Sequence, residues 1–274
     1  MRVMTSVLCQ VIEHVPGARR GPPEADATLS WREILGEPAM TSETSDDRRP
    51  LLYGTLRATA SALGRVLYRP TIDGLEHIPR TGPVILAGNH LSFSDSVVIP
   101  LAVPRRVRFL AKSDYFAGPG VKGRLSRLTF NALGAVPVRR GTAREAIDAL
   151  ELGLKVLRDG EAFAIYPEGT RSRDGRLYRG RTGVAHLALE SGAPVVPVAL
   201  SGTERIQPIG ARVPRIAEIS IRFGAPMYFG AEYARMKPGP ARREITDEIM
   251  AAIQRLSGQE EAGVYNTYPS GDDI

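Results

Sequence analysis

Residues 84–95 read VILAGNHLSFSD, an apolar run followed by a polar turn that holds His90 and Asp95. On a helix, five steps of about 100° would leave these two side chains roughly 140° apart. They can meet only if His90 lies in a turn after a strand and Asp95 lies in the first turn of the next helix. Ser92 or Ser94 would then be the N-cap, and Asp95 would be favoured near the helix N-terminus. The stretch therefore predicts an imidazole held by a carboxylate, which is the geometry of a general base.

Three further segments extend this pattern along the chain. Residues 134–140 read GAVPVRR, residues 162–172 read AFAIYPEGTRS, and residues 195–198 read VVPV. Together with residues 89–95, they resemble the motifs of the glycerolipid acyltransferases, which acylate glycerol phosphates and lysophosphatidic acid. That family carries N-H-x4-D, G-x5-R, F-P-E-G-T-R-S and V-P-V in this order. The resemblance runs from about residue 72 to residue 223, over half of the chain.

The resemblance implies an α/β fold of the glycerol-phosphate acyltransferase type, with the catalytic pair of the family at His90 and Asp95. It also implies transfer of a fatty acyl group from acyl-CoA or acyl carrier protein to 1-acyl-glycerol 3-phosphate, which gives phosphatidic acid without a metal or cofactor. The residue chemistry suits such a reaction. An alcohol loses a proton as it attacks a thioester, and a histidine with an ordinary pKa of about 6.5 can accept that proton at neutral pH.

The candidate substrate-binding residues lie directly after predicted strands: Lys112, Arg140, Glu168, Gly169, Thr170 and Arg171. The resemblance implies that Glu168 and Arg171 contact the glycerol phosphate, and Arg140 matches the arginine of the second motif. Many family members carry Asp before that arginine, whereas this chain has Arg139, so either arginine could point inward. Two guanidinium groups on one phosphate would make several charge-assisted hydrogen bonds.

The composition fits a globular chain that meets phosphorylated partners. The net charge is +6, from 36 Lys and Arg against 30 Asp and Glu, and arginine carries most of the positive charge. Arginine suits phosphate, anionic lipid headgroups or nucleic acid. We expect no nucleic-acid partner, because aromatic residues make up only 6% of the chain and do not alternate with a basic run. The single cysteine, Cys9, excludes an intramolecular disulfide and a cysteine-cluster zinc site.

Alternating strand and helix patterns predict an α/β domain with a mostly buried mixed sheet flanked by helices. The predicted strands are 71–74, 84–88, 106–111, 134–138, 161–166, 194–200 and 217–223. The predicted helices are 94–103, 142–158, 182–191 and 241–257. Two of these helices carry clear buried stripes. In the second the stripe consists of Ile147, Leu150, Leu154 and Leu157, and in the last of Ile245, Ile249, Ile253 and Leu256.

The chain divides into four predicted parts. Residues 1–49 are polar and aperiodic, which indicates a disordered extension, and translation could begin at Met40. Residues 50–70 predict an amphipathic helix, either packed on the core or lying at a membrane surface with its arginines outward. Residues 71–257 form the predicted acyltransferase domain. Residues 258–274 predict a flexible tail.

Membrane contact is expected from outside the bilayer. No stretch of about eighteen residues lacks charged side chains, as a simple spanning helix would require. Residues 116–130 carry basic and apolar side chains and predict either a basic amphipathic lip at a membrane or an ordinary surface loop and helix. They include a G-x-G-x-x-G pattern, but Pro119 and the missing preceding strand argue against a dinucleotide site. We therefore expect a cytoplasmic protein that is peripheral on the inner face of the cell membrane and binds anionic lipid.

Three classes of function compete at this point. The first is an acyltransferase, acting on lysophosphatidic acid or on a different lysolipid or alcohol. The second is a hydrolase, but the chain has no G-x-S-x-G nucleophile turn. The third is a non-catalytic lipid-binding module, which would explain the basic helices but not the combination of His90, Asp95 and Glu168.

Overall fold

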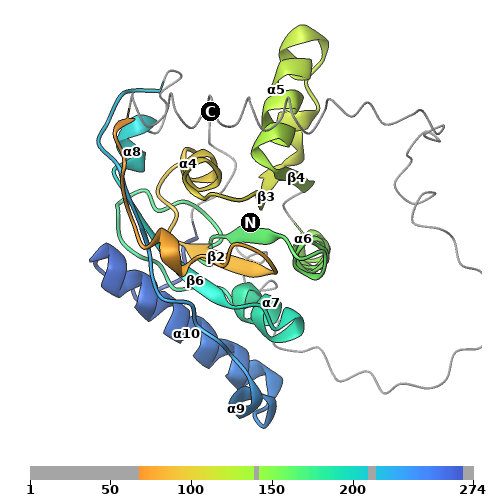
Figure 1. The fold of residues 1–274 in the computed structure, drawn as a ribbon, viewed down its shortest axis with the longest axis vertical. Helices are drawn as coiled ribbons and strands as arrows, with labels where there is room; N and C mark the ends of the chain where they lie inside the picture. Colours follow the sequence, from red (N-terminus) through yellow and green to blue (C-terminus); the bar gives the residue numbers. More distant parts are fainter. Residues whose placement is uncertain (1–67, 139–141, 209–213, 268–274) are drawn as a thin grey trace, which may run out of the picture.

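The computed structural model describes residues 68–138, 142–208 and 214–267, and a seven-stranded sheet lies at the centre of this part of the chain (Figure 1). The strand order across the sheet is β1-β7-β6-β2-β5-β3-β4. The strands are β1 Thr71–Asp73, β2 Val84–Gly88, β3 Val107–Lys112, β4 Ala135–Val138, β5 Ala162–Ile165, β6 Val195–Ser201 and β7 Ser220–Phe223. Neighbours are parallel except for the antiparallel pair β6 and β7. The predicted mixed α/β sheet is confirmed, and each predicted strand overlaps an observed one.

Helices cover both faces of the sheet (Figure 1). One face carries α4 Asp95–Ala102 and the end of α5 Gly120–Leu133, and the other carries α6 Ala143–Arg158, α7 Gly183–Ser191 and α10 Pro238–Ser257. Short elements complete the connections: η1 Leu75–His77, η2 Ser113–Phe116, α8 Thr203–Ile206 and α9 Ala231–Ala234.

The central strand β2 explains why its sequence is a continuous apolar run. Leu86 packs into the cluster under α4, whereas Ile85 and Ala87 pack into the cluster under α6, α7 and α10. All five residues of β2 are buried. A parallel strand covered on both faces has no solvent side, so it needs no polar alternation. The carboxyl end of β2 is therefore held rigidly.

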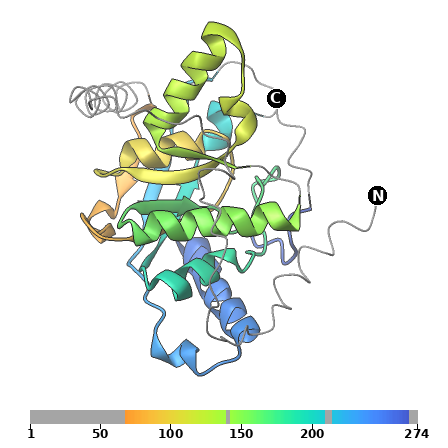
Figure 2. The same cartoon turned by 90° about the vertical axis from the view of Figure 1, so that its right-hand side faces the viewer.

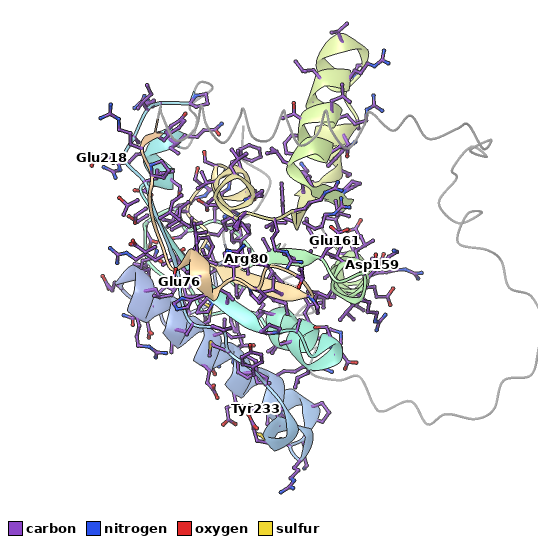
Figure 3. The ribbon with its side chains drawn as sticks, viewed as in Figure 1. Glu76, Arg80, Asp159, Glu161, Glu218 and Tyr233 are labelled. Carbon is purple, nitrogen blue, oxygen red and sulfur yellow. The ribbon has the colours of Figure 1, made fainter. Side chains whose placement is uncertain are left out.

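Helix α5 projects from the body of the fold, as two perpendicular views show (Figures 1 and 2). Its last turns are anchored through Phe130, whose ring lies 6.0 Å from that of Phe93 and 5.6 Å from that of Phe116. Figure 3 shows side chains on both sides of its projecting part. Three large apolar residues on this part are exposed: Val121, Leu125 and Leu128.

The buried stripe predicted for α6 is wrong at its first position. Leu154 and Leu157 are buried, but Ile147 is 42% exposed. The close contact of α6 with the sheet lies later in the helix, where a Cβ on Gly153 would come within 3.0 Å of the Phe163 ring. Ile147 lies nearly two turns before this contact.

The prediction of a flexible tail from residue 258 is wrong for residues 258–267. Leu177 forms a parallel bridge with Glu261, and Asn266 is only 1% exposed. Backbone hydrogen bonds to a loop hold this segment in place, so it can be polar and needs no apolar face. Residues 268–274 lie outside the described part of the chain.

Several other predictions also fall outside the described residues. They concern the extension 1–49, the amphipathic helix up to residue 67, and the arginines Arg139 and Arg140. Within the described ranges, no helix is both long and apolar enough to cross a membrane.

Candidate active site

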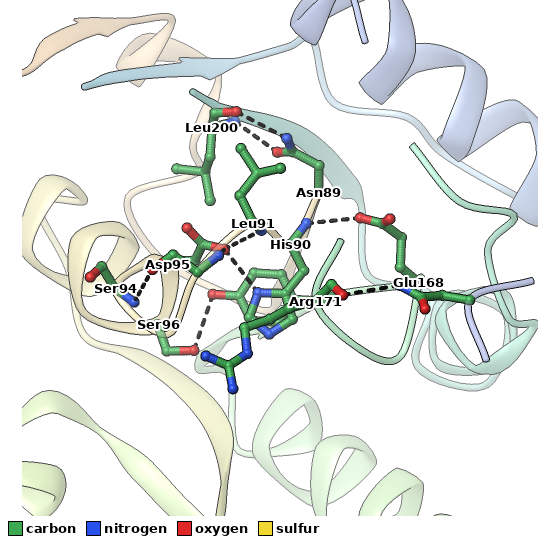
Figure 4. A network of polar contacts seen from close by, with 12 residues as sticks. Asn89, His90, Leu91, Ser94, Asp95, Ser96, Glu168, Arg171 and Leu200 are labelled. Atoms are coloured by element: carbon green, nitrogen blue, oxygen red, sulfur yellow. Dashed lines mark hydrogen bonds and ion pairs between the residues drawn. The ribbon is translucent and has the colours of Figure 1, made fainter. Parts of the chain in front are cut away.

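His90 and Asp95 meet at the carboxyl end of the central strand β2 (Figure 4). His90 lies in the turn after β2, and Asp95 is the first residue of α4. The imidazole Nδ1 lies 2.8 Å from Asp95 Oδ2, and the two side chains are 13% and 0% exposed. Because the carboxylate can only accept, Nδ1 donates the hydrogen bond and Nε2 is left as the basic nitrogen of the ring. The strand–turn–helix unit expected from the spacing is present.

The Asp95 carboxylate is fixed by the turn that it faces. Its Oδ2 also accepts from the backbone N–H groups of Leu91 at 2.7 Å and Ser92 at 2.8 Å. Ser94 occupies the N-cap position, but its side chain makes no capping hydrogen bond, and its N–H instead donates to Ser92 Oγ. The expected side-chain cap by a serine is therefore not formed, and the Asp95 carboxylate folds back over the turn that precedes the helix. This arrangement orients the carboxylate toward His90.

Tyr166 covers one face of the His90 ring, a contact that the sequence did not predict. The two ring centroids lie 4.0 Å apart with an angle of 9° between the planes. The Tyr166 hydroxyl lies 3.3 Å from Ser96 Oγ on α4. Tyr166 is the first residue of the YPEGTRS segment, directly after β5. This position at a strand end was the sequence feature that could have indicated a contact with the His90 turn. Stacking restricts the rotation of the imidazole.

Glu168 ties the two motif turns together from inside the fold. It is fully buried, its Oε1 accepts from His90 N at 2.8 Å, and its Oε2 accepts from Tyr178 N at 3.0 Å. Burial raises the pKa of Glu168 to about 7, although both backbone hydrogen bonds oppose this shift. The expected direct contact of Glu168 with the glycerol phosphate does not fit this geometry, because the carboxylate faces inward. Its observed role is to hold the backbone of His90.

The loop after β5 places Gly169, Thr170 and Arg171 beside the His90 turn. Ser172 N donates to His90 O at 2.7 Å, which joins the two turns through the backbone. Gly169 has a φ of 79°, and a Cβ there would lie 2.8 Å from the Arg181 side chain, so glycine is required. Figure 4 shows the Arg171 guanidinium extending past the His90 ring.

Lys112 lies at the end of β3, at the same edge of the sheet. Its ammonium pairs with Asp114 Oδ2 at 2.7 Å, and both side chains are well exposed. β3 is separated from β2 by β5, so Lys112 lies two strands away from the strand that leads to His90. Arg140 follows β4, one strand further, and its own position is not among the described residues. The structure brings together His90, Asp95 and the Glu168–Arg171 loop, and it places Lys112 at the end of a strand that lies two positions away in the sheet.

Asn89 completes the edge of the site. Its Nδ2 donates to Leu200 O at 2.9 Å, and its Oδ1 accepts from Leu200 N at 2.7 Å. The side-chain amide thus pairs with β6 where the backbone of β2 has turned away. This pairing fixes the residue before His90 and explains the asparagine that opens the N-H-x4-D motif.

These features define a class of site. A buried carboxylate orients a histidine at the carboxyl edge of an open α/β sheet, where such folds commonly bind ligands, and an arginine extends beside it. The described residues hold no cluster of three His, Cys, Asp or Glu side chains that could bind a metal ion. The arrangement can remove a proton from a hydroxyl group near an anion.

Comparison with known proteins shows which proteins this chain resembles. Residues 69–201 match the family model described as Acyltransferase. It is 34% identical over 145 residues to a chloroplast 1-acyl-sn-glycerol-3-phosphate acyltransferase of Brassica napus, an alignment that covers 53% of this chain and 40% of that protein. A 1-acyl-sn-glycerol-3-phosphate acyltransferase of Borreliella burgdorferi is 31% identical over 132 residues, or 48% of this chain and 51% of that protein.

A solved structure shares the fold. The 1-acyl-sn-glycerophosphate (LPA) acyltransferase PlsC of Thermotoga maritima superposes with a TM-score of 0.57 at 22% identity, over 79% of this chain and 84% of that chain. The alignments with the relatives in Brassica and Borreliella cover about half of those proteins or less.

Proposed function

We propose that this chain transfers a fatty acyl group from acyl-CoA or acyl carrier protein to the free hydroxyl of 1-acyl-glycerol 3-phosphate, forming phosphatidic acid. The observation that carries the proposal is the 2.8 Å contact of His90 Nδ1 with Asp95 Oδ2. The acceptor hydroxyl oxygen attacks the thioester carbonyl carbon while its proton passes to His90 Nε2. The C–S bond then breaks, and the thiolate takes the proton, so a C–O ester bond replaces the thioester.

Each neighbour of His90 has a part in this proposal. Asp95 holds the tautomer in which Nε2 is basic, and its negative charge stabilises the imidazolium that forms. Tyr166 limits the ring to one orientation through stacking. Direct attack by the acceptor requires no acyl-enzyme, which agrees with a site that offers a base and no nucleophile turn.

We propose that Arg171 binds the phosphate of the acceptor, together with Arg140. Arg171 belongs to the loop that is joined to the His90 turn by the Ser172 N to His90 O hydrogen bond. A guanidinium on the loop beside the base would fix the phosphate while the neighbouring hydroxyl faces Nε2. Lys112, which pairs with Asp114, would contribute long-range attraction for the anion.

An apolar cavity beside the site suits an acyl chain. It has a volume of about 220 Å³ and lies between α4 and the strands β1 and β7. Its wall includes Ser94, the residue before Asp95, and apolar side chains that include Phe93, Val97, Leu101 and Ile221. A chain in this cavity would leave its polar end near His90. Donors of several chain lengths would test how the cavity limits the substrate.

We propose that α5 contacts an anionic membrane surface, which we place at the inner face of the cell membrane. Its three exposed apolar residues lie beside exposed Arg124 and Arg127, and residues 120–133 include no Asp or Glu. Apolar insertion and headgroup attraction would act together there. Phe130 of this helix contacts Phe93, which lines the apolar cavity. The membrane contact would thus adjoin the site where a lipid substrate is used.

Incubation of the purified protein with lysophosphatidic acid and acyl-CoA tests the proposal. Formation of phosphatidic acid supports it, whereas release of free fatty acid alone would indicate a hydrolase and no product would indicate a lipid-binding module. Parallel reactions with acyl carrier protein as donor, and with other lysolipids as acceptors, define the substrate pair.

A further inference from the structure

The C-terminal segment 258–267 lies along the loop that carries Arg171, although it is outside the residues that match the family model. Leu177 N donates to Glu260 O at 2.8 Å, and Ala262 N donates to Leu177 O at 2.9 Å. One step further, Arg179 N donates to Val264 O at 2.9 Å. These backbone bonds fix the segment against the loop over several residues.

Near its end, this segment inserts a buried side chain behind Arg171. Asn266 is 1% exposed, and its Nδ2 donates to Arg171 O at 3.0 Å. The guanidinium groups of Arg179 and Arg181 lie over the Tyr265 ring, at 5.1 and 5.8 Å from its centroid. Arg181 also donates to Asn266 O at 3.4 Å. Asn266 is therefore held firmly where it meets the loop.

The peptide unit between Arg171 and Ser172 is consequently bound on both sides. Its carbonyl accepts from Asn266 Nδ2, and its N–H donates to His90 O at 2.7 Å. A peptide group that is bonded at both its C=O and its N–H cannot rotate without losing one bond. The orientation of the Arg171 backbone thus depends on Asn266 as much as on the His90 turn.

The other end of the segment reaches the residue before His90. Gln259 Oε1 accepts from Asn89 Nδ2 at 2.8 Å, and Gln259 Nε2 donates to Gly175 O at 2.7 Å. The segment therefore contacts both motif turns of the site, one at each end.

We propose that Asn266 is a positioning residue that aims Arg171 at the acceptor phosphate. The inference rests on the proposed role of Arg171 in binding that phosphate. Without Asn266, the peptide unit keeps one of its two bonds, and the guanidinium must be ordered each time the acceptor binds. That ordering lowers acceptor affinity and leaves the proton transfer at His90 largely unchanged.

The test compares Asn266→Ala with Thr267→Ala, a matched variant at the adjacent exposed position. We expect Asn266→Ala to raise the KM for lysophosphatidic acid about tenfold, which corresponds to about 1.4 kcal/mol. The KM for the acyl donor and kcat should stay close to those of Thr267→Ala. In an Arg171→Ala background, adding Asn266→Ala should have little further effect on the acceptor KM, because the aimed group is absent.

The outcomes separate this inference from the proposed function. If the wild-type protein forms no phosphatidic acid, the proposed function fails and the role of Asn266 fails with it. If the wild type is active but Asn266→Ala matches Thr267→Ala, or raises both KM values equally, the positioning role is refuted while the function stands. Should Asn266→Ala fail to fold, Asn266→Leu retains side-chain volume without the donor, and the same comparison decides.

Discussion

The raised pKa of Glu168 makes the stability of the fold depend on pH in an unusual direction. The pKa rises from the ordinary 4.5 to about 7 because the carboxyl is buried. The folded state therefore binds a proton more readily than the unfolded state between these two values. By linkage, stability falls as the pH rises through this window, and the loss is complete above the folded pKa. Most carboxylates with depressed pKa values act in the opposite sense.

The size of the effect follows from the two pKa values. Relative to a Glu168 that is protonated in both states, the folded state is destabilised by about 1 kcal/mol at pH 5 and by about 3 kcal/mol at pH 8, so about 2 kcal/mol is lost across this range. Solvent does little to screen this charge, because the Glu168 side chain is 0% exposed. In Glu168→Gln this pH dependence should disappear. The substitution should also lower stability at pH 5, because an amide has one oxygen acceptor for the two N–H groups of His90 and Tyr178.

Urea unfolding at several pH values from 5 to 8 measures the slope directly. The wild type should lose stability toward pH 8 relative to Glu168→Gln, and Glu151→Gln, which alters an exposed carboxylate on α6, should follow the wild type. The comparison between variants removes contributions from other titrating groups, including His186, whose pKa is lowered by burial. Equal slopes of stability against pH in the wild type and Glu168→Gln would show that Glu168 stays ionised from pH 5 to 8 and that its pKa is not raised.

Three further predictions concern activity and membrane binding. His90→Ala should lower kcat by a factor of about 10² to 10⁴ in a protein with an unchanged circular dichroism spectrum, and Asp95→Asn by roughly a hundredfold, because the tautomer is no longer fixed; near-normal turnover in folded His90→Ala would exclude the general base. Arg171→Ala should raise the KM for lysophosphatidic acid about tenfold to a hundredfold with little change for the acyl donor, and an equal effect on both substrates would contradict a phosphate clamp. Serine at the three exposed apolar positions of α5 should reduce flotation with anionic vesicles at least tenfold, whereas serine at the exposed Ile216 and Tyr228 should not; equal flotation of both variants would shift the membrane contact elsewhere.

The sheet and the meeting of His90 with Asp95 could be predicted because local sequence determines both. The strands β2, β4, β5 and β6 are apolar runs, and the five-residue spacing allows only one way for the two side chains to meet. The sheet order brings β2 and β5 together, and parallel strands then place their turns at one edge.

The direction of Glu168 could not be predicted in the same way. A carboxylate in a turn can face a ligand or the backbone, and the sequence YPEGTRS is compatible with either. The outcome depends on His90 N and Tyr178 N, which lie 78 residues before Glu168 and 10 residues after it. The same holds for the stacking of Tyr166 on His90, since ring contacts form only after both strands are in place.

The C-terminal segment shows why polar composition is an incomplete guide to disorder. A segment without an apolar face gains little from burial, which is the usual reason to expect disorder. Here the backbone of residues 258–267 satisfies the N–H and C=O groups of a loop about 85 residues earlier, which would otherwise need other partners in the folded state. A buried amide at Asn266 then bonds to the carbonyl of Arg171. If His90 and Arg171 act as proposed, a polar segment far along the chain gives the loop beside the base its rigidity, and the stability of that segment contributes to acceptor binding.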